Sequence, residues 1–96
     1  MARYVLLLNW TEQGIKGYKE TVNRAAAARQ AFEKKGSRVL DCYWTLGSYD
    51  LVLTAEAPDD ETITAISIGL GALGNVKTTT LRAFNEEEMR KILQKV

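Results

Sequence analysis

The chain has 96 residues, a net charge of +1, 46% hydrophobic residues and 26% charged residues. This length suits one domain spanning residues 1–96, and the near-neutral charge gives no overall field to attract nucleic acid or an anionic membrane. The absence of histidine and the single cysteine, Cys42, exclude Ser-His-Asp and Cys-His catalysis, the usual structural zinc sites and an intrachain disulfide.

A strand and a helix are predicted first. Residues 3–9 (RYVLLLN) are apolar with little polar alternation, which predicts a strand buried on both faces. Residues 16–35 are rich in good helix formers, and Gly36 stands where the helix should end. Spacings of three and four predict that one stripe of this helix is buried: Tyr18, Val22, Ala25, Ala28 and Phe32.

A hairpin is predicted over residues 37–57. Two strand-like runs flank Gly47-Ser48, a pair suited to a type II′ turn, so Trp44 should face Leu51 and Asp41 should face Thr54. Alternation then predicts a core face made of Leu40, Cys42, Trp44, Leu46, Tyr49, Leu51 and Leu53. It predicts a second, mixed face made of Val39, Asp41, Tyr43, Thr45, Asp50, Val52, Thr54 and Glu56.

A helix, a strand and a terminal helix complete the chain. Asp59 is a suitable N-cap for a helix that buries Ile63, Ile66, Leu70 and Leu73. Residues 76–84 (VKTTTLRAF) predict a strand. Asn85 with Glu88 resembles a capping box, and the final helix has an apolar stripe of Met89, Ile92, Leu93 and Val96.

The order of the elements is therefore βαββαβ followed by a helix. A tight hairpin excludes an all-parallel sheet. The pattern predicts an α+β, ferredoxin-like sandwich in which a four-stranded antiparallel sheet carries two helices on one face. The first and third strands are the most continuously apolar, as expected of the two central strands.

Residues 69–74 (GLGALG) match the G-x-G-x-x-G spacing of dinucleotide-binding loops. Such a loop follows a strand and opens a helix, whose N-terminus holds the pyrophosphate. The residues after Gly74 are β-formers, so we expect no nucleotide here. The glycines instead indicate a weakened helix end with Gly74 at its cap.

The stretches LGSYDLVLTAEAPDDE and GNVKTTTLRAF, with NWTEQGI and TLRAFNEEEM, resemble the GYD domain family. That family is named for a Gly-x-Tyr-Asp-like turn, here Gly47, Tyr49 and Asp50. The resemblance implies a dimeric α/β-barrel type of protein, in which open sheet faces pair, and a family with no established activity. Proteins of similar architecture include cofactor-free monooxygenases and small-molecule sensors. Many of those enzymes use a histidine, which this chain lacks.

Ten residues are candidate ligand-binding groups. Tyr49 and Asp50 suit polar contact or proton transfer near a barrel mouth, although Asp50 could instead stabilise the hairpin. Arg82 suits an anionic ligand group, or else a solvated edge strand. The remaining candidates are two threonines on the face of Arg82, residues at the junction of the first strand and helix, and two on the mixed face: Thr78, Thr80, Asn9, Trp10, Tyr18, Tyr43 and Thr45.

These patterns support three hypotheses. The first is a cytoplasmic, homo-oligomeric module whose mixed sheet face closes against a second copy and leaves a pocket for a small molecule, without cofactor, metal, nucleic-acid or membrane partner. The second is a cofactor-independent enzyme, monooxygenase-like or isomerase-like, with Tyr49 or Asp50 as acid or base and Arg82 as anion anchor. The third is a structural or regulatory module that docks on another protein through its terminal helix. Whether the chain has enzymatic activity is left open.

Overall fold

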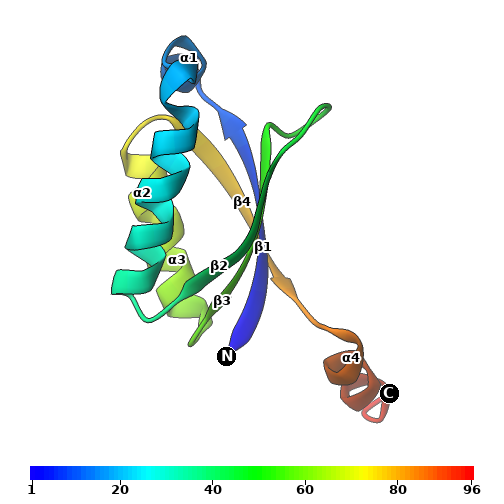
Figure 1. Ribbon diagram of the computed structural model, residues 1–96. Coiled ribbons are helices and arrows are strands. Elements are labelled where there is room, and N and C mark those ends of the chain that lie inside the picture. The colour runs from blue at the N-terminus through cyan, green and yellow to red at the C-terminus, as the bar shows by residue number, and fades with distance from the viewer.

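The computed structural model describes residues 1–96, and Figure 1 shows the course of the chain. Four strands and three longer helices follow one another in the predicted order, and two short helical segments that were not predicted separately precede the first long helix. Their bounds are β1 Ala2–Trp10, α1 Glu12–Lys16, the 3₁₀ helix η1 Tyr18–Glu20, α2 Thr21–Lys34, β2 Arg38–Trp44, β3 Leu51–Ala57, α3 Asp60–Ala72, β4 Val76–Ala83 and α4 Glu86–Leu93.

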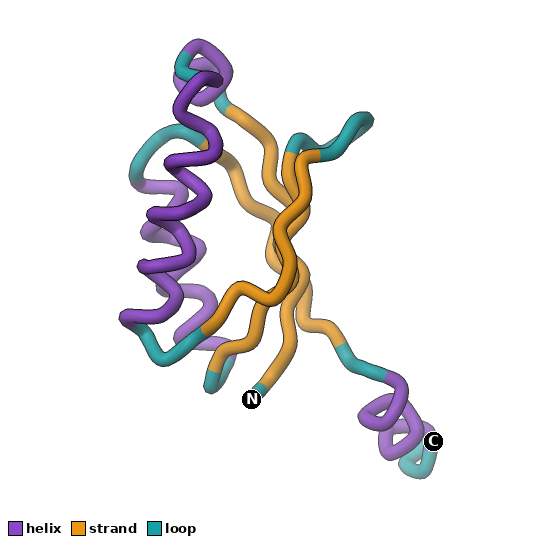
Figure 2. Tube along the Cα trace, in the orientation of Figure 1, coloured by secondary structure: helices purple, strands orange, loops and turns teal.

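The four strands form one antiparallel sheet in the order β2-β3-β1-β4. The central position of β1 and β3 confirms the prediction from their apolar character. Figure 2 shows α2 and α3 as a layer on one side of the sheet, with α4 on the other side and apart from the rest of the domain. The predicted α+β, ferredoxin-like fold is therefore confirmed.

The core lies between the sheet and the α2–α3 layer. On β1, Tyr4, Leu6 and Leu8 are buried, while Val5 and Leu7, which alternate with them, are half-buried. The prediction that this strand is buried on both faces is therefore wrong for the single chain, because no helix covers the second face. The other buried apolar residues come from α2, β2, β3 and α3: Phe32, Val39, Leu51, Leu53, Ala55, Ala57, Ile63 and Ile66.

The first helical region differs from the single helix predicted. Thr11 caps the short α1 by accepting a hydrogen bond from the Gly14 N–H at 3.1 Å, and the chain turns at Gly17 before η1 and α2. Tyr18 and Val22 are 55% and 64% exposed, and of the predicted stripe only Phe32 is buried. The stripe prediction was wrong at its N-terminal end because Tyr18 lies in η1, outside α2, and Val22, ten residues before Phe32, is about 80° around α2 from it at 3.6 residues per turn.

The hairpin register is confirmed from Asp41↔Thr54 to Trp44↔Leu51. Other details of the hairpin prediction are wrong at both of its ends. A β-bulge between Val39 and Asp41 places Val39 in the core in place of Leu40.

At the other end of the hairpin, the strands stop at Trp44 and Leu51, so residues 45–50 form a longer loop than the two-residue turn. Leu46 is fully exposed there, because no strand pairing holds it against the core. Trp44 is also exposed rather than buried.

Three predicted helix ends are confirmed. Gly36 has a φ of 66° after α2, and the Ser37 N–H donates to the Phe32 carbonyl at 2.9 Å, as in a Schellman motif. Asp59 caps α3, and Asn85 and Glu88 form a capping box on α4. Gly69 and Gly71 lie within α3, which excludes the strand that a dinucleotide loop requires before its first glycine.

Candidate functional site

The sheet face opposite α2 and α3 is termed the open face. Cross-strand partners share a face, so the pairs Tyr43↔Val52, Val52↔Leu7 and Val5↔Leu81 place these five apolar residues together on it. Tyr43 is 60% exposed and Leu81 is 45% exposed. The open face therefore presents an apolar centre that no helix of the same chain covers.

Polar pairs lie beside that centre on β2, β3 and the start of β1. Glu56 lies between two arginines, with Arg3 at 3.7 Å and Arg38 at 3.2 Å from its carboxylate oxygens. The Thr54 hydroxyl donates to Asp41 at 2.7 Å. An apolar centre with a polar rim is the usual anatomy of a protein–protein interface.

Helix α4 is the second uncovered apolar surface. Its residues Met89 and Leu93 are exposed and none of its side chains is fully buried. Glu88 connects it to the sheet through an ion pair with Arg82 at 3.7 Å. The predicted stripe continues through Ile92, whereas Val96 lies beyond the end of the helix. An amphipathic helix of this kind normally buries its apolar stripe against another element.

Asp50 holds the hairpin loop against the end of β1. Its carboxylate accepts a hydrogen bond from the backbone N–H of Trp10 at 2.8 Å, and its own N–H donates to the Leu8 carbonyl at 2.9 Å. Within the loop, the Thr45 hydroxyl donates to the carbonyl of Tyr49 at 2.6 Å. These contacts give Asp50 and Thr45 a structural role in the loop.

Thr78, Thr80 and Arg82 share one face of β4, and that face is the helix-covered one. Their cross-strand partners are the buried Leu8, Leu6 and Tyr4, in that order. The Thr80 hydroxyl lies 2.9 Å from that of Ser67 on α3. The structure therefore separates these three candidates from Tyr43, which lies on the open face.

Arg82 is largely engaged within the chain. Its guanidinium lies 4.5 Å from the ring centroid of Phe84 and 5.6 Å from that of Tyr4, besides pairing with Glu88. The capping hydrogen bond from the Asn85 N–H, followed by the charge of Arg82, keeps the pKa of Glu88 below its usual range. These contacts join the end of β4 to the beginning of α4.

Tyr4 is a buried polar group that the sequence analysis did not single out. Its hydroxyl donates to Asp60 Oδ1 at the start of α3, at 2.6 Å. Burial, together with the hydrogen bond to Asp60 and the negative charge of Asp60, raises the pKa of Tyr4 to about 12. A tyrosine directly before a run of aliphatic residues was the available signal, because a buried phenol requires a hydrogen-bond partner.

The three candidates near the end of β1 do not form one group. Asn9 pairs with Lys77 on the open face. Tyr18 is exposed in η1. Trp10 lies on the helix side, where it lines a cavity.

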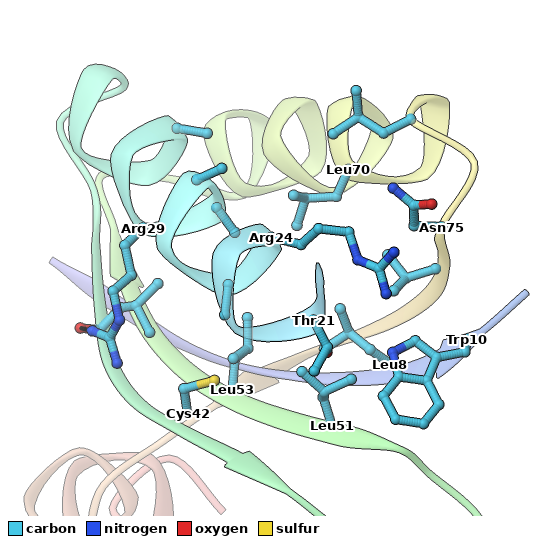
Figure 3. Close-up of a pocket in the computed structure, with 17 residues that line it drawn as sticks. Leu8, Trp10, Thr21, Arg24, Arg29, Cys42, Leu51, Leu53, Leu70 and Asn75 are labelled. Atoms are coloured by element: carbon cyan, nitrogen blue, oxygen red, sulfur yellow. Dashed lines mark hydrogen bonds between the residues drawn. The ribbon is translucent and has the colours of Figure 1, made fainter. Parts of the chain in front are cut away.

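That cavity, termed the α2 cavity, lies between α2, α3 and the sheet (Figure 3). It has a volume of about 150 Å³, and 13 of its 17 lining residues are hydrophobic. Leu8, Leu51 and Leu53 belong to its sheet side. Its polar lining consists of Thr21, Arg24, Arg29 and Asn75, with no aspartate or glutamate. The signal in the sequence was the run of alanines in α2, which leaves space where larger side chains would pack.

No three acidic, cysteine or histidine side chains gather closely enough to hold a metal ion. Glu86, Glu87 and Glu88 occupy the first turn of α4, where they favour the positive end of the helix dipole. No helix combines the length and apolar character needed to cross a bilayer.

The fold defines the chain as a ferredoxin-like α+β domain with one sheet face left open. Its sequence matches the model of the GYD domain over residues 4–93, and the chain belongs to that family. It is also 33% identical over 84 residues to a protein of Thermus thermophilus named glutamine synthetase and cystathionine beta-lyase binding protein. That match covers 86% of this chain and 88% of the relative.

Two solved structures are similar. The crystal structure of MtbAldR superposes with a TM-score of 0.62 at 19% identity, covering 88% of this chain and 52% of the other. The chain thus spans about half the length of that protein, and the likeness concerns the fold alone. The crystal structure of TTHA0845 from Thermus thermophilus gives a TM-score of 0.56 at 26% identity, covering 88% of this chain and 95% of the other.

Proposed function

We propose that this protein is a self-associating binding module in which two copies pair their open faces to form a dimeric α/β barrel. The observation that carries the proposal is the uncovered apolar centre formed by Leu7, Val52, Tyr43, Val5 and Leu81. Removing such an area from water contributes roughly 25 cal/mol per Å² of apolar surface. Helices cover this sheet on one side only, so its second apolar face is exposed to water. The same face of a second copy supplies a matching surface that covers it.

Helix α4 supports the same assembly. It leaves the end of β4 on the side of the open face, as Figure 1 shows, and Met89 and Leu93 are exposed on it. We propose that its apolar stripe packs on the second copy at the edge of the paired sheets. The Arg82–Glu88 ion pair connects α4 to the end of β4, and the apolar stripe of the helix is uncovered in the single chain.

The test compares two substitutions that place aspartate at exposed apolar positions. Leu81→Asp introduces a charge into the open face, whereas Val22→Asp does so on α2, at a residue 64% exposed. Native mass spectrometry at micromolar concentration should show a dimer for the wild type and for Val22→Asp, and a monomer for Leu81→Asp. A monomeric wild type, or a Leu81→Asp variant that remains dimeric, would overturn the proposal.

The module is further proposed to bind a small molecule. The hypothesis from the sequence located that ligand between the paired sheets. The α2 cavity is a better candidate, because it already has a volume of about 150 Å³ within a single chain. A cytoplasmic location, expected from the single cysteine, remains a prediction.

A second candidate function is regulation by binding other proteins. It is favoured by one observation, the name of the Thermus thermophilus relative, which describes binding to glutamine synthetase and cystathionine beta-lyase. Size-exclusion chromatography of this protein with those two enzymes from its own source organism tests the idea directly. Co-elution that is lost on substituting Met89→Asp would support docking through α4, whereas separate elution from both enzymes would contradict it.

The enzymatic alternative has less support. Asp50, the proposed acid or base, already accepts the Trp10 N–H, and Arg82 stacks on Tyr4 and Phe84 on the helix-covered side. Tyr49 lies in the hairpin loop, away from that arginine in the fold. The proposed acid or base and the proposed anion anchor do not lie around one space, as catalysis would require.

A further inference from the structure

The α2 cavity exists because α2 carries small residues where it faces the sheet. Ala25, Ala28 and Ala31 line it from the helix, and Leu70 lines it from α3. Protein interiors are otherwise packed with few spaces larger than a water molecule. An apolar cavity of about 150 Å³ is large enough for a benzene ring. The size and lining of this cavity therefore suit a compact apolar group.

The charged side chains that line the cavity are both cationic. Arg24 and Arg29 contribute to it, and neither is in an ion pair, because the five pairs of the molecule involve other side chains. Arg24 donates one hydrogen bond, to the Gly14 carbonyl at 3.0 Å, and a guanidinium has five N–H donors. Figure 3 shows the Arg24 side chain extending toward Asn75. An arginine that has no ion-pair partner and has free N–H donors is suited to bind a carboxylate through two parallel hydrogen bonds.

Cys42 completes the apolar side of the cavity. Its thiol is half-buried, and this burial raises its pKa, while the charge of Arg29 acts in the opposite direction. The thiol is therefore uncharged at neutral pH and supplies no anion to neutralise the arginines.

We propose that the α2 cavity binds a small carboxylic acid whose apolar body, about the size of a benzene ring, lies between α2 and the sheet and whose carboxylate pairs with Arg24. This inference rests on the proposed small-molecule binding and names its site and ligand class. It does not depend on the pairing of the open faces, because the cavity lies on the other side of the sheet.

Benzoate is the probe for the test, and benzyl alcohol is an uncharged probe of similar size. Isothermal titration calorimetry of the wild type should show benzoate binding that is at least tenfold tighter than that of benzyl alcohol. Arg24→Gln should remove this difference by weakening benzoate binding alone. Arg24→Lys keeps the positive charge on a flexible side chain, so partial recovery of benzoate binding in this variant would indicate that charge contributes.

The matched control lies on the same helix. Ala28→Leu fills the cavity and should abolish benzoate binding, whereas Ala26→Leu adds the same atoms at an exposed position outside the lining and should leave binding unchanged. Thermal unfolding verifies that both variants are folded.

Failure to bind benzoate, or equal binding by the two leucine variants, would overturn the inference. The Leu81→Asp variant separates it from the proposed assembly. Binding of benzoate to that variant at wild-type affinity would support a cavity that is complete in one chain. Loss of binding in the folded monomer would overturn this assignment and indicate a site that requires both copies.

Discussion

Asp50 and Trp10 are 40 residues apart in sequence, yet the carboxylate of the first accepts the backbone N–H of the second at 2.8 Å. This hydrogen bond closes the hairpin loop onto the end of β1, next to the point where the chain enters α1. This structural role accounts for the presence of aspartate in the Gly-x-Tyr-Asp-like turn, so no catalytic role is needed to explain it. The carboxylate accepts the Trp10 N–H just beyond the point where the pairing between β1 and β3 ends.

Removing this acceptor should destabilise the fold. Asp50→Ala leaves the Trp10 N–H without its partner, and hydrogen bonds to charged groups contribute about 1.5–3 kcal/mol. Urea denaturation should show a loss of that order in the free energy of unfolding. Asp50→Asn, which keeps an acceptor oxygen, should lose less. Equal stability of wild type and Asp50→Ala would show that the hydrogen bond has no structural importance.

Gly14 is predicted to tolerate no side chain. A Cβ at this position would lie 2.0 Å from the Asn75 carbonyl oxygen, which is backbone and is held by the Thr11 N–H at 3.0 Å. Gly14→Ala should therefore lower the free energy of unfolding by roughly 1–3 kcal/mol, the usual cost of overpacking.

Gly69→Ala is the control for this substitution, since the residue is inside α3 and the Cβ that alanine adds would meet no atom within 4 Å. It should stabilise the protein by about 0.5–1 kcal/mol, because alanine favours a helix interior over glycine. Two alanine variants with the same sign of effect would contradict the proposed contact between α1 and the α3–β4 connection.

The stability of the protein should fall at high pH because of Tyr4. Its pKa is about 12 in the folded state and about 10 in the unfolded chain, so the native state favours the protonated phenol. The resulting contribution to stability is present below about pH 10 and is lost as the pH rises through 12. Tyr4→Phe should show a weaker decline over this range than the wild type.

A spectrophotometric titration gives an independent measurement. One of the four tyrosines should ionise only near pH 12 or on unfolding, and Tyr4→Phe should lack that late step. Four tyrosines that all ionise together near pH 10 in the folded protein would refute a buried hydrogen bond between Tyr4 and Asp60.

Ala28→Leu should stabilise the protein in the absence of any ligand. The leucine side chain adds apolar contacts in the α2 cavity, and substitutions that fill cavities commonly contribute about 0.5–2 kcal/mol. Differential scanning calorimetry should show a higher Tm for Ala28→Leu than for Ala26→Leu. A lower Tm would mean that the neighbouring side chains already occupy this space as they move. The added leucine would then be overpacked.

The local features of the fold were predictable because each depends on residues close together in the chain. The caps at Asp59 and Asn85, the positive φ at Gly36 and the pairing of Trp44 with Leu51 were all expected and are present. The family resemblance, carried by short motifs, is confirmed by a match over residues 4–93.

Features that depend on the bulge or on distant packing were not predictable. The bulge places Val39 in the core instead of Leu40, and no local sequence pattern indicates a bulge there. Arg82 was correctly grouped with Thr78 and Thr80, but only its pairing with Tyr4 shows that this face lies under the helices. The α2 cavity was not predicted because alanine was read only as a good helix former. Helix propensity says nothing about the space that a small side chain leaves in the core.

The amino-acid sequence by itself determined the order of the strands and longer helices, the caps of α3 and α4 and the antiparallel arrangement, since hydrophobic spacing and capping act over a few residues. The tertiary structure decided which side of the sheet each candidate residue faces and where an empty space remains. The physical reason is that a strand's two faces are distinguished only by the partners that cover them. Those partners, such as Ser67 for Thr80 and α2 for Leu51, come from distant parts of the chain.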